Sequence, residues 1–216
     1  MLKDGIEFYY QACQLKDLLR QGAVQWGVKK ERLESIAEHT YGCMILAIAL
    51  HSELKLDINL GKTLEMLAIH ELEEIFIGDI TPLSHIEKKN LDNKARKMVS
   101  SILQSLHQHD ELLALTDEFN LNYSKEAKFA RAVDKLECVL EFKKYQDNGQ
   151  VSLKNLTDDM LKNNHLKTLV ESKKYDLADI FFIYHLPAYK DFGIDEKLWF
   201  NVLKPIKTLN YQEKEI

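Results

Sequence analysis

The chain has 216 residues, of which 45% are hydrophobic and 29% charged, with only 8 Gly and 3 Pro. This shortage of turn-forming residues argues against an all-β fold and excludes collagen-like and disordered chains, and the length suits one domain of generous size. With 29 basic against 34 acidic residues the net charge is −5, so a nucleic acid polymer is not expected as a partner.

Apolar residues recur at helical spacing along almost the whole chain, and strand-like alternation is nowhere convincing. The sequence therefore predicts an all-α fold. Gly78 stands where a helix C-terminal cap is expected, with Pro82 four residues later, and Ser124 stands where an N-cap is expected. The predicted helices span residues 4–20, 33–53, 60–77, 86–107, 109–119, 124–146, 155–163, 166–183 and 195–208.

A polar stretch between Asn148 and Asn164 divides the chain into two predicted parts. We expect one domain over residues 1–150 and a C-terminal helical extension over residues 151–216 that packs on the same domain. An apolar surface on the C-terminal helices would support a homodimer. The aromatic residues of the extension are interpreted as core or subunit contacts, and its histidines as surface or capping residues; they are Phe181, Phe182, Tyr184, Trp199, Phe200, His165 and His185.

The cysteines and the N-terminal segment bear on location. Cys13, Cys43 and Cys138 are odd in number, widely spaced and without a CxxC pair, which argues against a disulfide framework. The first residues lack the basic-then-apolar layout of a signal peptide, and no stretch approaches about 18 uninterrupted apolar residues. We therefore expect a cytoplasmic protein that neither spans nor binds a membrane.

The predicted helix 60–77 carries charged residues along its apolar stripe. At about 100° per residue, His70 and Glu74 lie roughly 40° apart on one face, with Glu71 beside them. Burying two carboxylates and an imidazole without partners costs several kcal/mol. The helix alone therefore leaves two interpretations open, a solvated acidic face or a metal site.

Two other predicted helices carry similar anomalies. His39 shares its face with Cys43 and points inward, and Asp134 lies beside an apolar stripe. Taken singly, His39 is a core histidine and Asp134 a salt-bridge partner. The simpler joint hypothesis is that His39, His70, Glu71 and Asp134 converge on one divalent metal. Two imidazoles and two carboxylates suit Mn, Co, Fe, Ni or Zn rather than Ca, with Mg kept among the candidates, and leave positions open for water and substrate.

These residues resemble the signature of the HD phosphohydrolase superfamily, which is His, then His-Asp, then a distant Asp. The chain is similar in particular to the 5′-deoxynucleotidases of that superfamily. The resemblance runs from about Trp26 to Tyr145 and is carried by three motifs: ESIAEH (34–39), HELEEIFIGDITP (70–82) and EAKFARAVDKLE (126–137). It implies that His39, His70 and Asp134 bind the metal, with Glu71 at the Asp position of the doublet.

The same resemblance implies roles in handling the substrate. Glu74 matches an acidic residue of acid–base catalysis, Asp79 an aspartate that positions the nucleotide and its sugar, and Trp26 a tryptophan placed against the deoxyribose. The chain departs from the family pattern at two positions. Glu71 replaces Asp and is one methylene longer, and catalytic geometry is sensitive to such shifts. An arginine that precedes the tryptophan in some relatives is Gln25 here, so the candidates to supply its charge to a phosphate are Lys29, Lys30 and Arg32.

The sequence thus predicts a metal-dependent phosphohydrolase that converts (deoxy)nucleoside 5′-monophosphates to nucleoside and phosphate. The substrate is a small nucleotide, and the metal activates water for attack on phosphorus. Two alternatives stay open: another HD phosphohydrolase, acting on phosphodiesters or nucleoside polyphosphates, or a catalytically weakened helical module that binds nucleotide.

Overall fold

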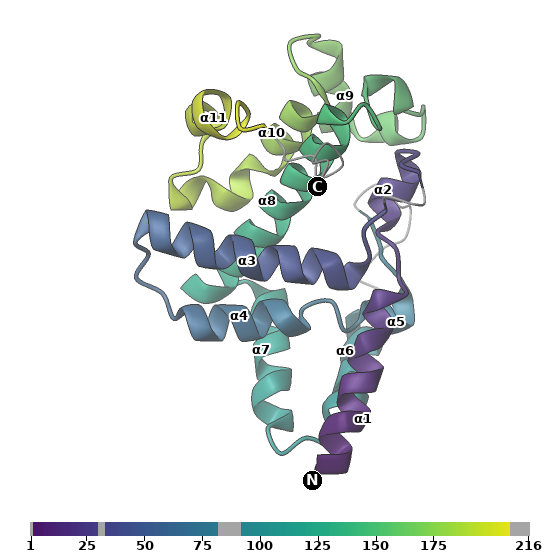
Figure 1. The fold of residues 1–216 in the computed structure, drawn as a ribbon, viewed down its shortest axis with the longest axis vertical. Helices are drawn as coiled ribbons and strands as arrows, with labels where there is room; N and C mark the ends of the chain where they lie inside the picture. The colour runs from purple at the N-terminus through teal and green to yellow at the C-terminus, as the bar shows by residue number, and fades with distance from the viewer. Residues whose placement is uncertain (1, 30–32, 82–91, 208–216) are drawn as a thin grey trace, which may run out of the picture.

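The computed structural model describes residues 2–29, 33–81 and 92–207 (Figure 1). Within these ranges the chain forms helices and turns, with one isolated β-bridge and no strand, so the all-α prediction is confirmed. No helix in these ranges is both long and apolar enough to cross a membrane. The α-helices are α1 (Leu2–Ala12), α2 (Gln21–Gln25), α3 (Ile36–Leu54), α4 (Leu60–Ile69), α5 (Glu74–Ile77), α6 (Asp92–Leu103), α7 (His109–Leu121), α8 (Lys125–Asp147), α9 (Asn164–Glu171), α10 (Leu177–Tyr189) and α11 (Glu196–Leu198).

Helix α8 links the two ends of the molecule. It packs against α3, α4 and α7 on one side and along α10 on the other (Figure 1). Its residues Phe129 and Val133 belong to the core shared with α3 and α4, and Leu136 and Val139 to the core shared with α10. Asp134 lies between these two sets, so the polar residue of the predicted site is held at the middle of the most deeply packed helix.

Local caps explain where the helices that carry the site begin and end. Ser35 accepts a hydrogen bond from the backbone N–H of Glu38, and the Glu38 carboxylate accepts from the backbone N–H of Ser35, which closes a capping box at the start of α3. Ser124 caps α8 through the backbone N–H of Ala127, as predicted. Gly78 ends α5 with φ of 73°, the conformation that favours glycine, also as predicted. Pro82 lies outside the described residues.

The predicted helix 60–77 is wrong, because the chain forms two helices with a turn between them. Helix α4 ends at Ile69, and α5 begins only at Glu74. In the turn, the N–H of Leu72 bonds to the carbonyl of Ile69 and the N–H of Glu74 to that of Glu71, three residues back instead of four. The ring Nδ1 of His70 also bonds to the carbonyl of Leu67. The turn, rather than one helical face, therefore determines where His70, Glu71 and Glu74 lie.

Four other predicted helices differ from those observed. Residues 155–163 form only short 3₁₀ turns, and the predicted helix 166–183 is α9 and α10, separated where Lys173 has φ of 55° and Asp176 caps α10. The predicted helix 4–20 is α1 and a 3₁₀ turn, and 195–208 is α11 followed by a π-helical turn. Apolar spacing continues across these breaks, which is why the pattern did not reveal them.

Candidate metal centre

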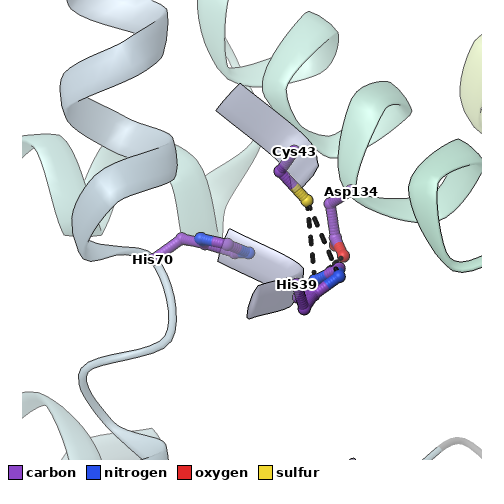
Figure 2. Close-up of side chains that lie close together, drawn as sticks. All are labelled: His39, Cys43, His70 and Asp134. Carbon is purple, nitrogen blue, oxygen red and sulfur yellow. Dashed lines mark hydrogen bonds and ion pairs between the residues drawn. The ribbon is translucent and has the colours of Figure 1, made fainter. Parts of the chain in front are cut away.

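Two buried histidines come from different segments and face a common point (Figure 2). His39 lies in the first turns of α3, and its Nδ1 is 2.5 Å from Oε2 of Glu137 on α8. His70 follows α4, and its Nδ1 is 2.7 Å from the carbonyl oxygen of Leu67. Metal-binding histidines usually donate their second ring N–H to a carboxylate or a backbone carbonyl in this way. In each ring the contact at Nδ1 leaves Nε2 to face the cluster, where Nε2 of His39 meets Asp134 and Cys43.

Two carboxylates complete the cluster. Oε1 of Glu71 is 3.3 Å from Nε2 of His70 and 3.6 Å from Nε2 of His39. Oδ1 of Asp134 is 3.3 Å from Nε2 of His39. The structure therefore brings together all four predicted ligands, His39, His70, Glu71 and Asp134.

The donor atoms fit a divalent metal. Within the described ranges the buried Nε2 of His70 has no hydrogen-bond partner, although it lies close to Glu71. Buried polar atoms are nearly always satisfied, so this exception needs a ligand that the protein itself does not supply. Donors held about 2.0–2.2 Å from one ion lie roughly 3.0–3.5 Å apart, close to the separations between these nitrogens and oxygens. Glutamate in place of aspartate still places Oε1 within 3.3–3.6 Å of Nε2 of both histidines.

Cys43 is a fifth potential donor. Its Sγ lies 3.6 Å from Nε2 of His39, and His39, Cys43, His70 and Asp134 each offer a donor atom within 4.8 Å of the others (Figure 2). Mutual distances alone therefore select Cys43, and not Glu71, as the donor beside the two histidines and Asp134. We favour Glu71 as the fourth ligand, because its Oε1 lies within 3.3–3.6 Å of Nε2 of both histidines. The sequence placed Cys43 on the inward face of α3 but assigned it no chemistry.

Electrostatics keep the two ligand carboxylates ionised. Burial alone raises the pKa of Glu71, but the imidazole of His70 and the charge of Arg20 outweigh it and hold that pKa below its usual range. Burial likewise opposes ionisation of Asp134, yet the Lys135 ammonium and the hydrogen bond with His39 hold its pKa well below the usual value. Glu74 behaves in the opposite way: burial and the carboxylates of Glu71 and Asp79 raise its pKa to about 10.

A pocket opens beside the cluster, and several predicted residues line it. Glu74 and Asp79 lie on its wall, as does Trp26, which is buried. The Trp26 ring packs edge-on against Phe142 and Phe181, with centroids 6.2 and 5.2 Å away. The other three predicted binding residues are not placed there: Lys29 is exposed and does not line this pocket, and Lys30 and Arg32 lie outside the described residues.

Arg20 is the positive charge that the structure places at the site and that sequence reasoning missed. The backbone of Arg20 pairs with Glu34 beside the start of α3, which turns the side chain toward the cluster. Its guanidinium lies 3.8 Å from Glu71 and 3.6 Å from Asp79, and it donates to Sγ of Cys138 at 3.0 Å. The only signal in the sequence is a charge directly after two leucines, which is too common to identify a site.

Lys135 is a second cation missed in the sequence. Its ammonium lies 3.0 Å from Oδ2 of Asp134, and its side chain lines the pocket. Its neighbour Asp134 raises the pKa of Lys135, so the ammonium stays charged. The pocket therefore has positive groups from two separate segments beside the candidate ligands.

Comparison with known proteins identifies the family of the chain. A model described as the HD domain matches residues 12–173. The chain belongs to this family. The predicted resemblance is therefore confirmed, and the HD domain match extends from the end of α1 to just past α9.

Similar sequences include 5′-deoxynucleotidases. The chain is 29% identical over 136 residues to 5′-deoxynucleotidase HDDC2 of Mus musculus, covering 62% of this chain and 66% of that protein. It is 30% identical over 151 residues to 5′-deoxynucleotidase hdd1 of Schizosaccharomyces pombe, covering 66% of this chain and 74% of that protein. The chain thus spans about two thirds of the length of these relatives.

Solved structures share the fold. The PH0347 protein of Pyrococcus horikoshii OT3 aligns over 86% of this chain and 98% of its own, with a TM-score of 0.56 and 24% identity. A predicted metal-dependent phosphohydrolase of Magnetospirillum magnetotacticum MS-1 aligns over 69% of this chain and 75% of its own, with a TM-score of 0.57 and 26% identity.

Proposed function

We propose that the chain is a metal-dependent phosphohydrolase that converts (deoxy)nucleoside 5′-monophosphates to nucleoside and inorganic phosphate. The observation that carries the proposal is the meeting of four donor groups beside a pocket, three of them buried, with the Nε2 of His70 lacking any hydrogen bond in the described chain. Membership of the HD domain family and the similarity to 5′-deoxynucleotidases support the reaction and the class of substrate.

The divalent ion, which is Mn, Co, Fe, Ni, Zn or Mg, would be held by His39, His70, Glu71 and Asp134. Such an ion, when bound, acidifies water and neutralises phosphate oxygens during an in-line displacement. Glu137 and the carbonyl of Leu67 fix the two imidazoles in the tautomer that presents Nε2.

Arg20 binds the phosphate of the substrate. Its guanidinium is planar and permanently charged, and it can face two phosphate oxygens at once. The ion pairs that now hold it, at 3.6–3.8 Å, are longer than good charge-assisted hydrogen bonds. An arriving phosphate can therefore gain contact with Arg20 without breaking a short ion pair, because the short bond of the guanidinium goes to Sγ of Cys138 and not to a carboxylate. This assigns to Arg20 the task that the sequence assigned to Lys29, Lys30 or Arg32.

Glu74 and Asp79 act on the leaving nucleoside. The buried Oε2 of Glu74 has no hydrogen-bond partner within the described residues and lies on the pocket wall, so Glu74 can hold a proton for the 5′-oxygen of the leaving group. Asp79 is held by the backbone N–H of Gln21 at 2.7 Å, which positions its carboxylate for a sugar hydroxyl. Trp26 lies on the same wall and would pack against the deoxyribose.

The test is elemental analysis of the purified protein combined with phosphate release from a substrate panel. The panel contains deoxynucleoside and ribonucleoside monophosphates, a phosphodiester and nucleoside triphosphates. We expect a bound divalent ion, and release from monophosphates that falls strongly in Glu74→Gln. Glu65→Gln, on the exposed face of α4, is the matched control. Release from only the phosphodiester or the triphosphates would favour another HD phosphohydrolase, and a protein without ion or turnover would favour the binding module.

Location, organisation and assembly are inferred from further features. All three cysteines are free, in keeping with a cytoplasmic location. We infer that residues 151–216 belong to the same domain as residues 1–150, because α10 packs along α8. The homodimer was predicted from an apolar surface on the C-terminal helices, where Val202 and Ile206 are exposed. We infer a larger supporting surface on α3, where Tyr41, Ile45 and Ile48 are 64%, 49% and 45% exposed. Light scattering of the purified protein, with Ile45→Glu as the variant, tests the dimer.

A further inference from the structure

Helix α10 lines the pocket that the candidate ligands share. Phe181, Tyr184 and His185, spaced on one face of α10, lie on its wall together with Phe142 of α8. The Phe181 ring packs on Phe142 with centroids 4.8 Å apart and edge-on against Trp26 at 5.2 Å. The sequence predicts Phe181 and Tyr184 as core or subunit contacts and His185 as a surface or capping residue. In the structure all three also line the pocket.

His185 lies where the charged and the aromatic parts of the pocket meet. The charges that act on its ring are Lys135 and Asp134 of the charged part, and its ring packs edge-on against Tyr184 with centroids 4.9 Å apart. Burial, followed by the positive charge of Lys135, lowers the pKa of His185 to about 4. The imidazole is therefore neutral near pH 7, with one N–H donor and one nitrogen acceptor.

Neither ring nitrogen of His185 takes part in a hydrogen bond with another described residue, although the residue is half-buried and lines the pocket. A neutral, half-buried imidazole without a partner in a pocket favours a ligand with both donors and acceptors. A phosphate has acceptors only at neutral pH and is better matched to Arg20. The polar edge of a nucleobase has both donors and acceptors, and its flat apolar face matches the aromatic side chains beside His185.

The neighbouring Tyr184 is already held in place from outside the pocket. Its hydroxyl accepts a hydrogen bond from Nδ2 of Asn163 at 3.1 Å, and its ring stacks on His165 at 5.3 Å. The contacts come from α9 and the residue before it, so the polar segment after α8 contributes to this wall. A wall fixed before binding loses little conformational entropy when a ligand arrives.

Resting on the phosphohydrolase function proposed above, we propose that α10 forms the nucleobase-binding wall of the active site, with His185 hydrogen-bonding to the edge of the base and Tyr184 and Phe181 covering its face. The substrate class is thus a nucleotide whose base contacts residues beyond position 150, and the C-terminal helices determine substrate affinity.

The experiment compares steady-state kinetics of the metal-loaded wild type with His185→Leu, which removes both polar groups, and His185→Gln, which keeps a donor and an acceptor. Substrates are the four common deoxynucleoside monophosphates and deoxyribose 5-phosphate, which has the sugar and phosphate but no base. We expect His185→Leu to raise KM for at least one nucleotide about 10-fold, the effect of one lost hydrogen bond, with kcat little changed. KM for deoxyribose 5-phosphate stays the same, and His185→Gln recovers part of the loss.

The control is His107→Leu, which removes an exposed imidazole that does not line the pocket and should leave every KM unchanged. Circular dichroism and thermal melting confirm that each variant is folded. If KM for deoxyribose 5-phosphate rises as much as KM for the nucleotides, or if no KM rises, the base-binding role of His185 is overturned. If the wild type releases phosphate from no nucleotide, the proposed function itself fails, and that result is distinct from the other two.

Discussion

Two clusters of buried charged groups lie in this molecule, and they differ in how completely they are satisfied. On α10, Asp179 accepts hydrogen bonds from Nε1 of Trp199 at 2.9 Å, from Nζ of Lys204 at 2.6 Å and from the backbone N–H of Asp176 at 3.1 Å. At the candidate metal centre, Nε2 of His70 and Oε2 of Glu74 have no partner in the described chain.

The difference separates a structural cluster from a functional one. Leaving a buried polar group without a hydrogen bond costs about 1–3 kcal/mol, so a folded protein retains such groups where something else uses them. The Asp179 cluster uses its charges to hold α10 against the last helical turns. The centre at His70 leaves its donor atoms available to a ligand. Substitutions in the first cluster should therefore change stability, and substitutions in the second should change metal binding and activity.

The largest effect is expected from His70→Asn. The Asn amide can replace the hydrogen bond from Nδ1 to the carbonyl of Leu67, whereas Nε2 is lost. Metal content and turnover should fall, turnover by about 10³-fold or more, because the ion contributes several kcal/mol to the transition state. The free energy of unfolding of the metal-free protein should change by less than about 1 kcal/mol, since no satisfied bond is removed.

Elemental analysis, phosphate release and urea unfolding measure these three quantities, with His107→Asn as the control. A variant that keeps its metal and its turnover would remove His70 from the centre.

The next effect distinguishes the two candidates for the fourth ligand. Glu71→Gln should weaken metal binding by at least about 10–100-fold, the loss that follows when a group hydrogen-bonded to a metal ligand is removed, because Oε1 faces Nε2 of both histidines. Cys43→Ser should stay within a few-fold of wild type. Competition with a chelating dye measures both affinities. The opposite ranking would make the sulfur of Cys43 the ligand and Glu71 its neighbour.

A smaller effect is expected on the structural side from Asp179→Asn. The substitution keeps the shape but removes the charge that pairs with Lys204, and it should lower the free energy of unfolding by about 2–3 kcal/mol. Metal content and kcat of the folded protein should be retained. Urea unfolding measures the change, with exposed Asp158→Asn as the control, expected within about 0.5 kcal/mol. A loss of metal in Asp179→Asn would mean that the two clusters are coupled.

The smallest effect concerns pH. Burial raises the pKa of Asp176, but the hydrogen bonds from Lys204 and from the backbone of Asp179 outweigh it, so the folded pKa lies below the ordinary 3.8. A lowered carboxylate pKa contributes stability that is fully present above about 3.8 and is lost as pH falls through the folded value.

Asp176→Asn keeps the N-cap of α10, because Asn is also a good capping residue, and removes only the charge. The difference in free energy of unfolding between wild type and Asp176→Asn should be below about 1 kcal/mol at pH 6, since the pair is partly exposed and screened. It should shrink toward pH 3. Urea unfolding across this range checks it, and a difference that does not vary with pH would show that the charge of Asp176 contributes nothing.

Much of the fold was predictable because several helices have unambiguous local signals. Apolar spacing and Ser124 predicted α8 within one residue at each end, and the predicted helices 33–53 and 109–119 correspond closely to α3 and α7. The same spacing failed across residues 70–73, where short-range bonds and the side chain of His70 turn the chain while the apolar pattern continues. The period of the apolar residues indicates which face of a helix is buried, but it does not indicate where the chain changes direction.

The four candidate ligands were predictable from residue type and position, because an imidazole or carboxylate on an inward face stands out in the sequence itself. Arg20 and His185 were not, because nothing in their own segments distinguishes them from surface residues. By itself, the sequence determined the all-α class, the family and the side chains able to hold an ion, since these follow from local pattern and chemistry. Only the tertiary structure decided which cation faces Glu71 and which helix closes the pocket, because both depend on how segments distant in the chain pack together.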